Sequence, residues 1–150
     1  SMELNNTDEL LCIRGESKNY AFEFSYIAEI CSGVQVSRVP CLPEAFIGVC
    51  SHKGEIVPVI RMEDMEGDGT ELILIIHCQG FSVGIVCQGT AYILPVQERS
   101  EVQTPEKEIP GKRWKEKGMI QTKSELYTVI DLEKTVMGIA KYFEEEYFYV

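Results

Sequence analysis

One sixteen-residue stretch of the chain occurs twice. Residues 48–63, GVCSHKGEIVPVIRME, align without a gap with residues 118–133, GMIQTKSELYTVIDLE. The identical pairs are Gly48/Gly118, Lys53/Lys123, Glu55/Glu125, Val59/Val129, Ile60/Ile130 and Glu63/Glu133. Each copy reads as a loop followed by a β-branched strand. A repeated element predicts two similar units in one chain, with chance resemblance between two β-rich stretches as the alternative.

Each copy follows a predicted β-hairpin. In the first hairpin, Tyr20, Phe22 and Phe24 alternate with other residues, as on a half-buried strand. In the second, LILIIHC and FSVGIVC flank the pair Gln79–Gly80. Ala21 and Gly84 stand at matching places 63 residues apart, whereas the later copies are 70 apart, so the extra residues fall in the polar loop 98–118. The sequence predicts two all-β subdomains, roughly 10–66 and 71–137, between which strands can be exchanged.

Two small sheets of this length need to curl into barrels or pack together to bury one face. A groove between them is the expected consequence. Asp131 suits a helix N-cap, and an apolar stripe with helical spacing follows it. The stripe consists of Leu132, Val136, Ile139, Ala140 and Phe143. We therefore predict a C-terminal helix over 131–143 that packs on the sheets.

Charge and hydropathy limit the classes of partner. The formal net charge of −10 opposes nonspecific binding of nucleic acid or anionic membranes, which needs clustered Lys and Arg. No apolar run approaches the roughly 18 residues that span a bilayer. The first residues, SMELNNTDEL, lack the basic and apolar segments of a signal peptide. We expect a cytoplasmic protein without nucleic-acid partners or direct membrane insertion.

Motifs for metals and catalysis are weak. The six cysteines form no C-x-x-C pair, so we expect them to act as small buried hydrophobes. The stretch DMEGDG imitates a calcium loop, but its twelfth position is Ile75 rather than a carboxylate. Neither histidine belongs to a metalloprotease motif, and no nucleophile elbow or phosphate loop occurs. The sequence predicts no catalytic residues, no metal site and no cofactor.

The chain resembles the CheW-like family of bacterial chemotaxis coupling proteins. The resemblance rests on the first hairpin with IAEI, on SRVPCLPEAFIGVCSHKGEIVPVI, on FSVGIVCQGTAYIL and on GMIQTKSELYTVIDLEK, which together span about 20–134. It implies a single domain, 1–150, with two five-stranded barrels of the Src-homology-three type and a C-terminal helix. It also implies a noncatalytic adaptor that binds the regulatory domain of the histidine kinase CheA and the cytoplasmic tip of chemoreceptors, and that can join copies of itself in ring assemblies.

The resemblance assigns partner-binding roles to six positions. These are Ile27, Glu29, Ile30, Gly48, Lys53 and Gly54. Glycine at 48 and 54 would let another backbone approach closely or would permit a positive φ. The alternatives are that Ile27 and Ile30 belong to the core and that the glycines only shape loops.

Three positions depart from the family pattern. Lys53 stands where the family usually has Arg, Arg61 where it has Asp after the PVI strand, and Gln88 where it has Asp after the second hairpin. The change from Arg to Lys removes a planar bidentate donor. A divergent receptor set, or loss of receptor binding with kinase binding kept, would follow. An alternative function is a small-molecule, metal or redox sensor that uses the groove with Cys50, His52 or Cys87.

Overall fold

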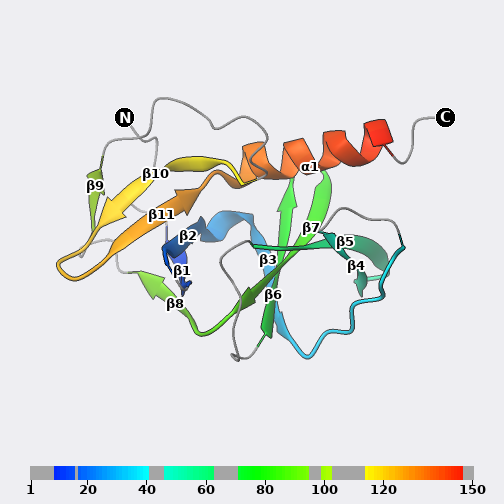
Figure 1. Cartoon of the computed structure of the whole chain (residues 1–150), viewed down its shortest axis with the longest axis horizontal. Coiled ribbons are helices and arrows are strands. Elements are labelled where there is room, and N and C mark those ends of the chain that lie inside the picture. Colours follow the sequence, from blue (N-terminus) through cyan, green and yellow to red (C-terminus); the bar gives the residue numbers. More distant parts are fainter. Residues whose placement is uncertain are drawn as a thin grey trace.

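The computed structural model describes residues 9–15, 17–40, 46–62, 71–94, 99–102 and 114–146. These residues form two β-sheets and one long helix, with the first sheet on the left of Figure 1 and the second on the right. Three of the segments considered above lie outside the described residues. They are the stretch DMEGDG at 64–69, residues 41–45 within the stretch SRVPCLPEAFIGVC that carries the family resemblance, and most of the predicted loop 98–118.

The first sheet has the strand order β8-β1-β2-β11-β10-β9. Its strands are β1 (Leu10–Arg14), β2 (Asn19–Glu23), β8 (Ala91–Leu94), β9 (Ser100–Val102), β10 (Glu116–Gln121) and β11 (Leu126–Ile130). The second sheet has the order β3-β6-β7-β5-β4. Its strands are β3 (Ile27–Ser32), β4 (Phe46–His52), β5 (Glu55–Arg61), β6 (Glu71–Cys78) and β7 (Phe81–Gln88). The second sheet thus has the five predicted strands, and the first has five plus the short β9.

The two sheets repeat one another strand for strand. In the second, β5 pairs in parallel with β7 and joins Val59 to Gly84; in the first, β11 pairs in parallel with β2 and joins Val129 to Ala21. Both β4–β5 and β10–β11 carry a register shift just before the repeated glycine. Each sheet combines a hairpin from one half of the sequence with a strand pair from the other half, because β1–β2 pairs with β11 and β6–β7 with β5.

The strand predicted through Phe24 is shorter than its alternation suggests. The chain leaves the first sheet after Glu23 and turns through a short 3-10 helix, η1 (Phe24–Tyr26), into β3 of the second sheet. Phe24 is 37% exposed instead of buried with Tyr20 and Phe22. The period-two pattern was wrong at this residue because the crossing between sheets ends the strand.

The buried residues form three clusters. One packs against one face of the first sheet around Cys12, Ala21 and Val129. Another lies on the concave face of the curled second sheet around Val59 and Ile75. The largest, which we call the seam, lies between the sheets and includes Phe22, Leu74 and Ile85. β6 is apolar at almost every position because one of its faces packs in the seam and the other packs in the cluster of the second sheet.

The second sheet curls so that its two edge strands approach each other. After β3 the chain runs back beside β4, where the Ser37 and Val49 backbones exchange two hydrogen bonds of 2.8 and 2.9 Å. His52 on β4 also contacts Glu29 on β3. Over the described residues, the strands of each sheet pair in a linear order that does not close on itself, so the closed barrels stay a prediction.

Helix α1 (Leu132–Glu146) confirms the predicted C-terminal helix. The Asp131 carboxylate accepts a 2.9 Å hydrogen bond from the Lys134 backbone N–H, as an N-cap does. Leu132, Val136 and Ile139 enter the seam. α1 lies along the upper side of Figure 1 over β6 and β7. Among the described residues, no helix has the length and apolar character needed to cross a membrane.

Candidate partner-binding surfaces

The β4–β5 turn forms one exposed end of the second sheet. Lys53 and Gly54, both with positive φ (50° and 79°), connect the paired residues His52 and Glu55. A two-residue hairpin turn with positive φ at both positions matches the twist of its strands. A Cβ at Gly54 would meet no atom within 4 Å, so glycine serves the backbone conformation there rather than close packing.

Glu29 lies at the same end. Its carboxylate Oε2 lies 2.5 Å from His52 Nε2, so the contact ties β3 to the residue that precedes the turn. Ile56, which follows the turn on β5, is 77% exposed. We call Glu29, His52, Lys53, Gly54 and Ile56 the turn surface. It gathers three of the six predicted partner-binding residues around an exposed aliphatic side chain.

Ile30 lines a groove where the two sheets meet. This seam groove encloses about 690 Å³. Its apolar lining comes from β1, η1, β3, β6 and β8 and consists of Leu11, Phe24, Ile30, Leu72, Ala91, Tyr92 and Ile93. Ile30 and Ile93 are 40% and 42% exposed, which is unusual for neighbouring large aliphatic side chains. Ile27 is instead half-buried against the seam, as the core alternative for it expects.

Ile93 was not among the predicted site residues, although the repeat relates it to the predicted residue Ile30. Ile30 pairs with Leu74 on β6, and Ile93 pairs with Leu11 on β1. Leu74 and Leu11 occupy the same place in the two hairpins, because they precede the residues paired with Gly84 and Ala21. Ile93 is therefore the counterpart of Ile30, and the groove brings the two together.

Gly48 is buried by its own chain. A Cβ at this position would lie 2.1 Å from the Ser37 carbonyl oxygen, which belongs to the segment that crosses β4. Glycine is needed for this internal close approach. A partner-binding role for Gly48 stays a prediction, with an internal role now visible beside it.

The three residues of the sensor alternative do not share a site. Cys50 lies in the cluster of the second sheet and Cys87 in the seam, and neither lines the seam groove, nor does His52. Burial raises the pKa of both thiols, which disfavours the reactive thiolate. Within the described residues, no group of three or more His, Cys, Asp or Glu side chains could hold a metal ion.

The corresponding end of the first sheet carries a polar network that the sequence did not predict. The Arg14 guanidinium donates two 2.9 Å hydrogen bonds to the Glu125 carboxylate and lies 4.8 Å from the Tyr92 ring centroid. The Tyr127 hydroxyl donates to Glu125 at 2.7 Å and lies 2.7 Å from the Tyr92 hydroxyl. Hydrogen bonds from Arg14 and then Tyr127 lower the pKa of Glu125 to about 2. This network joins strands that are far apart in sequence.

Comparison with known proteins gives a family and a fold. The family model described as "CheW-like domain" matches residues 9–137. The comparison with curated protein sequences gave no match. The crystal structure of the scaffolding protein TtCheW from Thermoanaerobacter tengcongensis is similar, with a TM-score of 0.70 and 16% identity over 85% of this chain and 91% of that chain. At this identity the likeness shows a shared fold. Because the family model matches residues 9–137 of the 150-residue chain, the chain belongs to the CheW-like domain family.

Proposed function

We propose that the protein is a noncatalytic, cytoplasmic adaptor that couples chemoreceptors to the histidine kinase CheA. Membership of the CheW-like family supports a chemotaxis scaffold. The similar structure, TtCheW, is described as a scaffolding protein. The observation that carries the proposal is the presence of two separate surfaces, the seam groove and the turn surface, on one double sheet.

The seam groove suits a helix from the receptor tip. Ile30, Ile93 and Phe24 offer an apolar floor, and exposed apolar patches of this kind mark protein contacts. An amphipathic helix binds such a groove by inserting side chains spaced three or four residues apart. The groove is built on strands from both sheets, so a helix in it would have a fixed direction relative to the whole molecule.

The turn surface suits the regulatory domain of CheA. Ile56 provides an apolar contact, and Lys53 and Glu29 provide charges of both signs around it. Protein interfaces commonly combine an apolar centre with a polar rim. Within the described part of the chain, the turn surface shares no residue with the lining of the seam groove, which would allow both partners to bind at once.

Three serine variants test this assignment. We expect Ile30→Ser to weaken binding of a receptor-tip fragment at least about tenfold, because a buried interface anchor contributes roughly 1–2 kcal/mol or more. Ile56→Ser should weaken binding of the CheA regulatory domain to a similar extent. Met137→Ser, at a 45% exposed position on α1, is the matched control and should change neither affinity. Isothermal titration calorimetry of each variant with each partner measures these effects.

Absence of CheA binding at tens of micromolar would contradict the adaptor function, and so would CheA binding without any receptor binding. A receptor fragment that is sensitive to Ile56→Ser but not to Ile30→Ser would reverse the assignment of the two surfaces. Lys53→Arg restores the residue usual in the family. The sequence expectation linked Lys53 to receptor binding, whereas we place it on the CheA surface. The variant should therefore strengthen CheA binding severalfold, since Arg can hold a carboxylate with two hydrogen bonds.

A further inference from the structure

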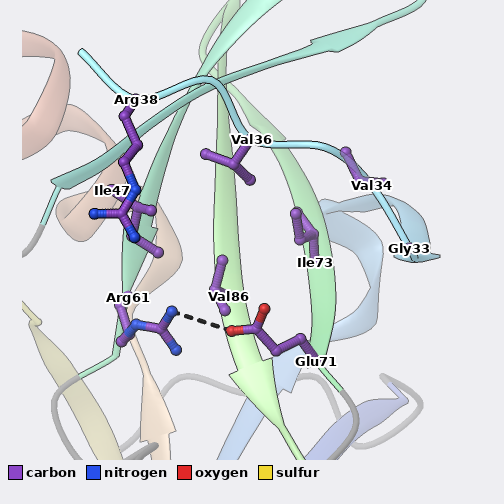
Figure 2. Close-up of a pocket in the computed structure, with 9 residues that line it drawn as sticks. All are labelled: Gly33, Val34, Val36, Arg38, Ile47, Arg61, Glu71, Ile73 and Val86. Atoms are coloured by element: carbon purple, nitrogen blue, oxygen red, sulfur yellow. Dashed lines mark hydrogen bonds and ion pairs between the residues drawn. The ribbon is translucent and has the colours of Figure 1, made fainter.

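A second cavity opens at the edge of the concave face of the second sheet. It encloses about 470 Å³, and Val36, Ile47, Ile73 and Val86 form its apolar wall (Figure 2). This volume falls within the roughly 300–1,000 Å³ of small-molecule sites. Among the described residues, the cavity shares no lining residue with the seam groove or the turn surface. It is therefore a separate candidate site.

Three charged side chains complete the lining. Arg61 follows Val59 by two positions on β5, and Glu71 precedes Ile73 by two on β6, so strand alternation places both on the concave face. Arg61 Nη2 donates a 3.0 Å hydrogen bond to Glu71 Oε2. Arg38 comes from the segment that crosses β4, and Figure 2 shows its guanidinium on the same side of the cavity as Arg61.

Among the residues that the structure describes, the cavity lining has an excess of positive charge in an acidic protein. Glu71 balances one of the two described arginines, whereas Arg38 forms no hydrogen bond or ion pair with any part of the chain that the structure describes. The described lining residues therefore carry a formal charge of about +1, against −10 for the whole chain. A monoanion matches this charge better than a dianion.

The repeat shows that the apolar wall is specific to the second sheet. Glu23 stands two residues after Ala21, and Lys117 stands at the register shift before Gly118; their counterparts are Val86 and Ile47. In the first sheet, Lys117 Nζ donates to the buried Glu23 carboxylate at 3.1 Å. The second sheet has apolar residues and an open cavity where the first has this ion pair.

We propose that this cavity binds a small amphipathic monocarboxylate, such as a medium-chain fatty acid or an aromatic acid. Arg38 holds the carboxylate, with Arg61 beside it, and the apolar body lies against Val36, Ile73 and Val86. A guanidinium group can donate two parallel hydrogen bonds to a carboxylate. The Arg61–Glu71 hydrogen bond is an example of a guanidinium–carboxylate contact within this cavity. The proposal does not depend on binding of CheA or receptors.

The test is a titration of the isotope-labelled full chain with octanoate, kept below its micelle concentration and followed by NMR. We expect saturable shifts of the backbone amides of Val36, Ile47, Ile73 and Val86. Arg38→Ala should weaken binding about tenfold, because it removes a charge-assisted hydrogen bond. Lys141→Ala removes the same charge from an exposed position on α1 and should leave the affinity unchanged.

Glu71→Gln provides a variant with the opposite expected effect. It removes the carboxylate that competes for Arg61, so octanoate should bind severalfold more tightly. Octanol should bind at least about fivefold more weakly than octanoate, since it lacks the charge. The proposal is overturned if no amide near the cavity shifts up to about 10 mM octanoate. It is also overturned if Arg38→Ala binds like the parent, or if octyl phosphate binds more tightly than octanoate.

Discussion

The two sheets share a backbone plan but differ at their exposed ends. Val59 pairs with Gly84 in one and Val129 with Ala21 in the other, in the same parallel register. At the end of the second sheet, the two-residue turn Lys53–Gly54 is followed by an exposed isoleucine. At the end of the first sheet, the turn at 122–125 is closed by its own hydrogen bonds, and Glu125 is held by Arg14 and Tyr127.

This difference shows how the two copies diverge at their exposed ends. In the first sheet, polar side chains at the turn bind one another and fix the end of the sheet. In the second, the counterpart of the 43% exposed Leu126 is the 77% exposed Ile56, and the Glu29–His52 contact is one of the contacts that join the edge strands. The shared register explains the fold, and the divergent ends explain why the second sheet offers the turn surface.

The close approach at Gly48 should produce the largest effect on stability. Gly48→Ala places a Cβ 2.1 Å from the Ser37 carbonyl oxygen. The segment around Ser37, which runs beside β4, must therefore move, at a cost of about 3 kcal/mol in stability. Gly138→Ala is the control, because its Cβ meets nothing within 4 Å and a helix gains about 1 kcal/mol from this change. Urea unfolding measures both. Equal stability of the two variants would show that the position of the segment around Ser37 does not require a glycine at 48.

The Glu23–Lys117 pair tests whether the two sheets can be made alike. Lys117→Met leaves the buried Glu23 carboxylate without its partner and should cost about 2 to 3 kcal/mol, less than a fully buried pair because Lys117 is partly exposed. The double variant Glu23→Val with Lys117→Ile copies the second sheet. It should lie within about 1 kcal/mol of the parent, since apolar residues can replace a buried pair. A double variant as unstable as Lys117→Met would contradict the structural equivalence of these positions.

Gly84→Ala makes the second sheet resemble the first at the parallel pairing. The new Cβ would lie 3.2 Å from Ile73 Cγ2 and 3.3 Å from Val59 Cγ2, so both side chains must shift slightly. The loss of backbone freedom in the unfolded chain partly offsets this strain. We expect a net change within about 1 kcal/mol of zero in thermal unfolding, whereas a loss of several kcal/mol would show that the second sheet cannot accept the alanine of the first.

The Arg14–Glu125 pair in the first sheet should make the stability of the protein depend on pH. The pKa of Glu125 falls from its ordinary 4.5 to about 2 in the folded protein, so the unfolded chain binds more protons between these values. The stabilisation is present above pH 4.5 and is lost as the pH falls toward 2. Glu125→Gln should flatten this part of the stability profile, whereas Glu55→Gln, at the repeat counterpart, should keep it. A profile unchanged by Glu125→Gln would contradict the network.

The sequence predicted the repeat, the hairpins and the capped helix because these depend on local patterns. Alternation and turn composition mark a strand, and Asp131 before an apolar stripe marks a helix start. A strand pattern does not specify its distant partner, so the combination of β2 with β11 and of β7 with β5 became visible only in the structure. The Arg14–Glu125 contact joins residues 111 positions apart and leaves no sequence signal.

Site prediction from the sequence relied on local backbone geometry, as at the turn residues Lys53 and Gly54, whose partner-binding role stays a prediction. It was incomplete where a surface is assembled from distant strands. The seam groove needs Phe24 and Ile93 as well as Ile30, and only the structure places them together. The cavity beside Arg38 and Arg61 has apolar residues where the other copy of the repeat has an ion pair. This correspondence can be seen only when the register between the strands is known.

Sedimentation velocity of a three-component mixture tests most directly whether two independent surfaces couple two partners. The chain, the CheA regulatory domain and a receptor-tip fragment are combined at concentrations above both dissociation constants. Simultaneous binding predicts one complex with the summed mass, which loses only the receptor fragment with Ile30→Ser and only CheA with Ile56→Ser. Two separate binary complexes, in which each partner displaces the other, would contradict coupling through two surfaces.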